Sequence, residues 1–210
     1  MTASFAEQRE HMLRHHLRQV RDVRVLGAMG QVPREEFVPE GQRARAYGDH
    51  PLPIGLEQTI SQPFVVAFMA ELARLDGSQR VLEVGTGSGY GAAVLSHLAR
   101  EVWTVERHGE LADRARARLA RLGYDTVHVI TGDGSKGLAE HAPYDAILVT
   151  AAAEVVPREY LEQLAEGGRL VIPVGPAGEN QRMYRLTRRG EGHTTEDLGP
   201  FRFVPLVVES

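Results

Sequence analysis

The sequence predicts a doubly wound α/β fold, in which helices cover both faces of a mostly parallel, seven-stranded sheet. Two observations support this prediction. From residue 63 onward, short apolar segments typical of buried strands alternate with segments that have helical character. A glycine-rich loop also joins the first of these strands to the next helix, as is common where such a fold binds a ligand. The 210 residues are enough for one compact unit with an N-terminal helical appendage.

Residues 1–62 are expected to form this appendage, which consists of two helices and a long loop. Ser4 and Glu7 have the spacing of a capping box and predict the start of the first helix. Asp22 is the expected cap of a second helix over about residues 22–30. The region 40–62 is rich in Gly and Pro and is predicted to be a loop. The apolar positions expected on the two helices are Met12, Leu13, Leu17, Val20, Val25, Leu26 and Met29.

Residues 63–210 are expected to form the main α/β unit. Pro63 suits the first position of a helix, which makes Gln62 its cap. Later helices should end near residue 99, cover 109–122 and cover about 157–165. The predicted buried strands are residues 80–84, 101–106, 127–131, 144–150 and 169–175. Two more strand-like runs, residues 182–189 and 201–208, predict a hairpin at the edge of the sheet.

The composition excludes several classes of site. Cysteine is absent, which excludes disulfides and thiolate metal sites. The absence of cysteine fits a reducing cytoplasm, where the protein is expected. No apolar run approaches the ~20 residues of a membrane span, and the first residues lack a signal peptide's apolar core. The net charge of −4 disfavours nucleic-acid binding. His11 and His15 are four residues apart but have no third ligand, so no metal site is expected. The arginines at 114, 116, 118 and 121 predict a solvated helix face.

The glycine loop has acidic residues at neighbouring strand ends. Gly85, Gly87 and Gly89 follow an apolar strand and permit a tight turn and close approach of a ligand to the backbone. The dinucleotide fingerprint G-x-G-x-x-G fails in both registers. Glu106 ends the second strand about 20 residues later, where an acid can bind ribose hydroxyls. Asp133 in "GDG" can accept a hydrogen bond from an adenine amine, and a turn-forming Asp-Gly pair is the less favoured alternative.

These features together resemble class I S-adenosylmethionine-dependent methyltransferases, which have a Rossmann-like fold. Their cofactor has no pyrophosphate, so it does not need the dinucleotide fingerprint. Glu83, in the strand before the loop, matches the acidic position that serves the amino acid end of the cofactor in this class. A plain strand–helix turn is the simpler reading of the glycines, and Glu106 with "GDG" weighs against it.

The segment before residue 63 narrows the resemblance. "AYGDHPLPIGLEQTISQP", with "VPREEFVP" before it and "ILVTAAAEVVP", "GGRLVIPVG" and "RFVPL" after it, closely resembles the protein-L-isoaspartate (D-aspartate) O-methyltransferase family over about residues 20–207. This sequence departs from the family's pattern at one position: Glu57 precedes Gln-Thr, where the family commonly has Gly. The resemblance implies methyl transfer from S-adenosylmethionine to the free α-carboxylate of isoaspartyl residues in damaged proteins and peptides. The ester then closes to a succinimide without the enzyme.

The resemblance also implies roles for individual residues. Ser61 matches the active-site serine, and the hydroxyls and amides from Gln58 to Gln62 stand where a helix is expected to begin, a place that binds anions. The implied substrate-binding residues are Thr59, Ile60, Ser61 and Thr150. The implied cofactor-binding residues are Gln58, Phe64, Glu83, Gly85, Thr86, Gly87, Ser88, Gly89, Glu106, Arg107, Asp133 and Gly134. Residues 1–62 would then carry the substrate loop and 63–210 the catalytic domain.

Several alternatives stay open on the sequence. Ser61 and Thr59 are also ordinary helix-capping residues. A relative that methylates another carboxylate, such as an aspartate in a modified natural-product peptide, would share these motifs. A nicotinamide-dependent oxidoreductase is disfavoured by the failed fingerprint, and a binding module without catalysis is the third rival. The expected partners are isoaspartyl proteins and peptides, with no nucleic acid or membrane, and a monomer is expected.

Overall fold

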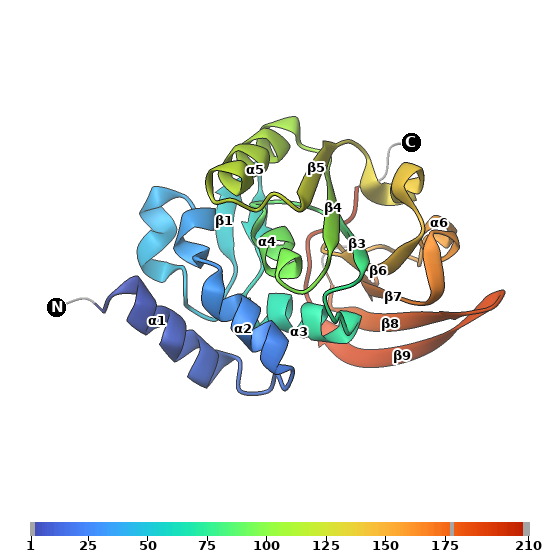
Figure 1. Ribbon diagram of the computed structural model, residues 1–210, viewed down its shortest axis with the longest axis horizontal. Helices are drawn as coiled ribbons and strands as arrows, with labels where there is room; N and C mark the ends of the chain where they lie inside the picture. The colour runs from blue at the N-terminus through green and yellow to red at the C-terminus, as the bar shows by residue number, and fades with distance from the viewer. Residues whose placement is uncertain (1–2, 177–178, 208–210) are drawn as a thin grey trace.

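A computed structural model describes residues 3–176 and 179–207 and confirms the doubly wound α/β architecture (Figure 1). Seven strands form one sheet in the order β5-β4-β3-β6-β7-β8-β9. The first five in this order are parallel, and β8 and β9 add an antiparallel hairpin at the edge. The strands are β3 (Arg80–Val84), β4 (Glu101–Glu106), β5 (Val127–Thr131), β6 (Tyr144–Val149), β7 (Leu164–Val174), β8 (Gln181–Arg189) and β9 (Gly192–Phe201).

Helices cover both faces of the sheet because successive side chains of its central strands are buried on opposite sides. Val81 of β3 belongs to the apolar cluster that includes α3 and α4, whereas its neighbour Leu82 belongs to the cluster under α6. The α-helices are α1 (Phe5–His11), α2 (Val23–Gln31), α3 (Pro63–Ala73), α4 (Tyr90–Ser96), α5 (Gly109–Arg121) and α6 (Arg158–Glu162). The shorter turns are a π-helix (Met12–His16) and 3-10 helices at Arg34–Phe37, Glu40–Arg45, Gly134–Lys136 and Ala139–His141.

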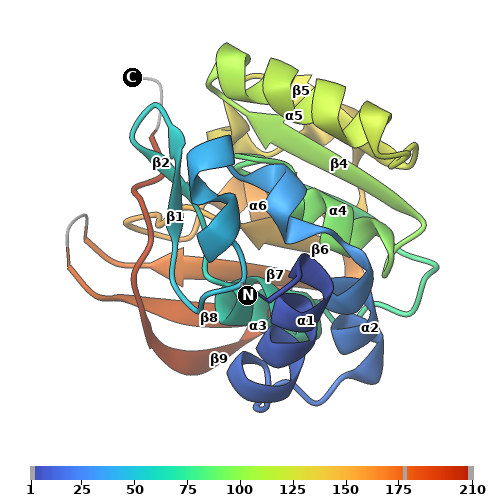
Figure 2. The same cartoon turned by 90° about the vertical axis from the view of Figure 1, so that its left-hand side faces the viewer.

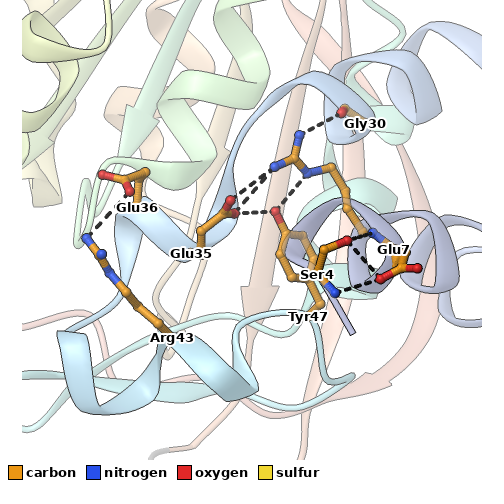
Figure 3. A network of polar contacts seen from close by, with 8 residues as sticks. Ser4, Glu7, Gly30, Glu35, Glu36, Arg43 and Tyr47 are labelled. Carbon is orange, nitrogen blue, oxygen red and sulfur yellow. Dashed lines mark hydrogen bonds and ion pairs between the residues drawn. The ribbon is translucent and has the colours of Figure 1, made fainter. Parts of the chain in front are cut away.

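The N-terminal helices begin where their capping residues predict. Ser4 and Glu7 form the reciprocal capping box that opens α1 (Figure 3), and the Asp22 side chain accepts from the backbone N–H of Arg24 at the start of α2. Met12 and Met29 are fully buried in the same apolar cluster as α3 and α4. The appendage therefore shares a core with one face of the sheet.

The expectation of a loop over residues 40–62 was wrong, because this region contains a second, two-stranded sheet. Strand β1 (Leu52–Gly55) pairs antiparallel with β2 (Gln58–Ile60). The turn between them places Leu56 and Glu57 at positive φ angles of 50° and 57°, which non-glycine residues adopt rarely. Residues 58–60 consequently lie on a strand and not at the start of α3. Gln62 precedes that helix as predicted, but its side chain makes no capping hydrogen bond.

The C-terminal elements also differ from the prediction. The last strand is the polar segment Gly192–Phe201, and not residues 201–208, of which the structure describes those up to 207. This strand lies at the sheet edge, where it is paired on one side only and needs few apolar side chains. Helix α4 ends at Ser96, one turn early, and α6 ends at Glu162 because β7 already begins at Leu164. Within the part of the chain that the structure describes, no helix is long and apolar enough to cross a membrane.

Candidate active site

A partly open cavity, which we call the chamber, lies beyond the carboxyl ends of β3, β4 and β6. Strand β2 and the segment 204–207 form its outer wall, and Figure 2 shows the β1–β2 hairpin beside the C-terminal part of the chain. The predicted site residues that line it are Gln58, Thr59, Ile60, Ser61, Glu83, Gly85, Thr86, Gly87, Ser88, Glu106, Arg107, Asp133, Gly134 and Thr150. The structure thus brings together most of the residues that the sequence singled out.

Two predicted residues do not line the chamber. The Phe64 ring stacks on the Phe68 ring at a centroid distance of 5.6 Å, on the first turns of α3. Gly89 caps α4 with a φ of 87°, and a Cβ there would lie 3.2 Å from the Leu119 side chain of α5. Gly89 therefore allows close helix packing beside the site, whereas Phe64 contributes to an aromatic stack.

The glycine loop is tied to the end of β6 by Thr150. Its Oγ1 lies 3.0 Å from the carbonyl oxygen of Val84 and 2.8 Å from that of Gly85. A Cβ at Gly85 would come within 2.3 Å of the same Oγ1, and the φ of Gly85 is 97°. Only glycine fits this position, because a larger residue would break the contact between the two strand ends.

Glu106 is held at the end of β4 by two backbone donors. Its Oε2 accepts from the N–H of Gly87 at 2.8 Å, and its Oε1 accepts from the N–H of His108 at 2.9 Å. The residue is 5% exposed. A carboxylate oxygen can accept more than one hydrogen bond, so both oxygens can also accept from the hydroxyls of a ribose.

Glu83 is a buried acid at the bottom of the chamber. Its Oε2 accepts from the Oγ1 of Thr104 at 2.6 Å. Burial raises the pKa of Glu83 to about 8, the hydrogen bond from Thr104 opposes this shift, and the charge of Glu106 adds to it. No positively charged side chain is among the groups that shift this pKa. An ammonium group of a ligand beside Glu83 would therefore stabilise the ionised form of this carboxyl group.

The space beside Glu83 is kept open by Gly91. A Cβ at Gly91 would lie 2.2 Å from Glu83 Oε1, so any larger residue would cover the carboxyl group. This opening and the buried, cation-free carboxyl fit the amino acid end of S-adenosylmethionine, and Glu106 fits its ribose. The chain therefore has groups suited to both parts of that cofactor.

Asp133 and Gly134 form the wall next to β5. Both Asp133 oxygens accept from Ser135, one from its N–H and one from its hydroxyl, each at 2.9 Å. Asp133 thus caps a short 3-10 helix as well as facing the chamber. A Cβ at Gly134 would lie 2.7 Å from the Val84 side chain, so the absence of a side chain at Gly134 lets the wall lie close to β3.

Sequence reasoning missed several parts of the site. Tyr90, Gly91 and the segment 204–207 also line the chamber, and residues 204–206 reach it through hydrogen bonds to Ala152 on both sides. Arg118 departs from the solvated face predicted for its helix, because it is half-buried and donates to the carbonyl of Ser88 at 2.8 Å. Gly91 is the last glycine of the stretch "GTGSGYG", which was a usable signal. The segment 204–207 overlaps "RFVPL", whose resemblance to a family strand beside the substrate was outweighed by the expectation that its apolar residues pack in the core.

Metal binding finds no support in the side-chain arrangement. Over residues 3–176 and 179–207, no three side chains of His, Asp or Glu come together in a way that could hold an ion. His11 and His15 have ring centroids 4.3 Å apart on the appendage, with His16 next to them.

Comparison with known proteins agrees with this geometry. A family model described as Protein-L-isoaspartate(D-aspartate) O-methyltransferase matches residues 7–210. The chain is 56% identical over 203 residues to protein-L-isoaspartate O-methyltransferase 2 of Pelobacter propionicus, with 95% of this chain and 90% of that protein covered.

Two solved structures are similar along almost the whole chain. A protein-L-isoaspartate O-methyltransferase has a TM-score of 0.83 at 31% identity, and the match covers 95% of this chain and 65% of that longer one. A candidate protein-L-isoaspartate O-methyltransferase of Plasmodium falciparum, in complex with S-adenosyl-L-homocysteine, has a TM-score of 0.82 at 25% identity and covers 98% and 99%. On its sequence and its fold, this chain belongs to the protein-L-isoaspartate (D-aspartate) O-methyltransferase family.

Proposed function

We propose that the chamber is the active site of an S-adenosylmethionine-dependent protein-L-isoaspartate O-methyltransferase. The chain transfers a methyl group to the α-carboxylate of isoaspartyl residues in proteins and peptides, the first step of their repair. The observation that carries the proposal is the shared lining of one cavity, in which the buried acids Glu83 and Glu106 face the same space as Ser61.

The acids and the glycine loop are proposed to hold the cofactor. Glu106 would accept from the ribose hydroxyls, Glu83 would face the amino group, and Asp133 would accept from the adenine amine. Bound S-adenosylmethionine supplies a methyl group on a positively charged sulfur. The backbone of Gly85 and Gly87 lines the chamber, where the cofactor would lie against it.

Ser61 is proposed to aim the substrate. An isoaspartyl carboxylate with a pKa near ~4 is already ionised at neutral pH, so no base is needed to activate it. The Ser61 hydroxyl can donate a hydrogen bond to one carboxylate oxygen and leave the other directed at the methyl group. Correct orientation alone can contribute ~7–11 kcal/mol to the lowering of a barrier.

Thr150 is proposed to shape the substrate wall rather than to donate to the substrate. Its hydroxyl lies at hydrogen-bond distance from two backbone carbonyls. A hydroxyl has one proton, which is therefore directed to the backbone. Its remaining role toward a peptide is to accept a hydrogen bond.

The decisive experiment is a methyl-transfer assay on paired synthetic peptides that differ only in isoaspartate or aspartate at one site. The isoaspartyl peptide should be methylated, and the aspartyl peptide should not. Equal methylation of both would favour a methyltransferase for another carboxylate. We also expect a monomer in the cytoplasm that acts on isoaspartyl proteins without a membrane or nucleic-acid partner, and light scattering in solution tests the monomer.

A further inference from the structure

One buried arginine joins the two ends of the chain segment that carries the substrate hairpin. Arg34 is fully buried in the 3-10 helix Arg34–Phe37. Its Nε donates to the carbonyl of Ala46, and its Nη2 donates to the carbonyl of Ser61, both at 2.7 Å. Residues 47–60, which include β1 and β2, form the segment of chain between these two carbonyls, and we call it the hairpin segment.

The buried guanidinium of Arg34 lies against an aromatic ring and hydrogen-bonds only to main-chain carbonyls. Its central carbon lies 4.8 Å from the centroid of the Tyr90 ring, which is itself buried and lines the chamber. Its Nη1 has no hydrogen-bond partner among the described residues. Both hydrogen bonds go to main-chain carbonyls and not to a carboxylate. Burying a charge in this way is costly, and packing alone would be served at lower cost by an apolar side chain.

The chain beside Ala46 is fixed independently by the appendage. The hydroxyl of Tyr47 donates to Glu35 and accepts from Arg9 Nε at 2.7 Å, and the guanidinium of Arg9 reaches Glu35 at 3.2 Å (Figure 3). The start of the hairpin segment is thus anchored to α1 and to Glu35, the residue next to Arg34. Its far end, Ser61, receives the Nη2 hydrogen bond from Arg34.

We infer that Arg34 is a positioning residue for methyl transfer, which fixes the main chain of Ser61 relative to Ala46 and so places the Ser61 hydroxyl in the chamber. This inference rests on the proposed function of Ser61. The planar fork of arginine suits two separate acceptors, whereas the single ammonium of lysine cannot reproduce its geometry. A small displacement of an aiming group strongly affects turnover.

The test compares Arg34→Lys and Arg34→Met with a matched control, Arg185→Lys. Methionine keeps much of the apolar packing on Tyr90 but has no donor. Arg185 is also buried and also donates to a main-chain carbonyl, that of Leu72. It differs from Arg34 in that its other hydrogen bonds go to Glu196 of β9 and not to the ends of the segment that carries the hairpin. Each variant is measured for kcat and KM with the isoaspartyl peptide, for the Kd of S-adenosylhomocysteine, and for amide hydrogen exchange over residues 47–60.

Both Arg34 variants should lower kcat at least tenfold, leave the Kd of S-adenosylhomocysteine within twofold, and speed amide exchange in the hairpin at least tenfold. Arg185→Lys should leave kcat and hairpin exchange within twofold of the parent chain. Unchanged kcat in a folded Arg34→Lys protein would overturn the inference, and so would a parallel loss of cofactor affinity. If Arg34→Met does not fold, Arg34→Lys decides.

Failure of the proposed function gives a different result. A parent chain that binds S-adenosylhomocysteine but methylates no isoaspartyl peptide would refute the proposed function. Hydrogen exchange in the hairpin needs no substrate, so it still reports whether Arg34 holds the segment. Parent-like exchange in both Arg34 variants would overturn the inference in that case as well.

Discussion

Replacing Glu83 by glutamine should make the cofactor-free protein more stable than the parent chain at neutral pH. Glutamine keeps the shape of a protonated glutamate and can still accept from the Thr104 hydroxyl, but it cannot ionise. In the parent chain, burial raises the pKa of Glu83 from 4.5 to about 8. Because this folded-state pKa lies above the unfolded value, the folded protein binds more protons than the unfolded chain between these pH values. The stability contributed by the neutral group is therefore lost as the pH rises through this range.

The expected size follows from the pKa shift. One pKa unit corresponds to ~1.4 kcal/mol, so between pH 5.5 and 7.5 the stability difference between variant and parent should grow by at most ~2.7 kcal/mol. Glu83 lines two adjoining cavities, and water in them would reduce the cost of ionisation. We therefore expect a growth of ~1 kcal/mol or more over this range.

Urea denaturation of both proteins without cofactor, at pH 5.5, 6.5, 7.5 and 8.5 (roughly the span of the shift), measures this difference. Subtracting one curve from the other cancels the titration of all other groups. The difference should rise with pH and level off above a pH of about 8. A constant difference would show that Glu83 is already ionised in the folded chain, and the electrostatic reason for an ammonium site would then be lost.

Three further substitutions test the rest of the chamber. Ser61→Ala should lower kcat by ~10–100-fold, the value of a hydrogen bond to a charged group, with S-adenosylhomocysteine affinity within about twofold of the parent; loss of cofactor binding would assign Ser61 another role. Glu106→Gln should weaken S-adenosylhomocysteine binding by ~1.5–3 kcal/mol in calorimetry, and an unchanged Kd would place the ribose elsewhere. Gly134→Ala should cost ~1–3 kcal/mol of stability, because the new Cβ would lie 2.7 Å from the Val84 side chain. The control Gly132→Ala should leave stability unchanged, because a Cβ there meets nothing within 4 Å. Equal denaturation midpoints for the two variants would refute the predicted steric clash with Val84.

The sheet and most of the chamber lining could be predicted because their signals are local. An apolar run such as "RVLEV" predicts a buried strand whichever residues surround it, and parallel strand ends necessarily meet at one edge. Glu83, Glu106 and Asp133 were therefore placed together by topology. The residue-level roles within the chamber remain predictions.

The parts that could not be predicted depend on contacts between distant segments. The turn at Leu56 and Glu57 adopts positive φ angles without the Asn-Gly pair that marks such hairpins. The polar strand Gly192–Phe201 pairs along its length with β8, and Arg182 and Arg185 of β8 form ion pairs with Asp197 and Glu196 across this pairing. The pairing is invisible in either segment alone. Arg34 and Arg118 likewise act on backbone carbonyls far away in the sequence.

The outer wall of the chamber joins β2, from the first third of the chain, to residues 204–207, which follow the last strand. We expect contacts between such distant segments to form later in folding than contacts between β3, β4 and β6, because the length of chain that they close is greater. The β3–β4–β6 strand ends can come together earlier. A refolding chain should consequently acquire affinity for S-adenosylhomocysteine before it can recognise a peptide, and the lag between these two events would time the closure of the wall.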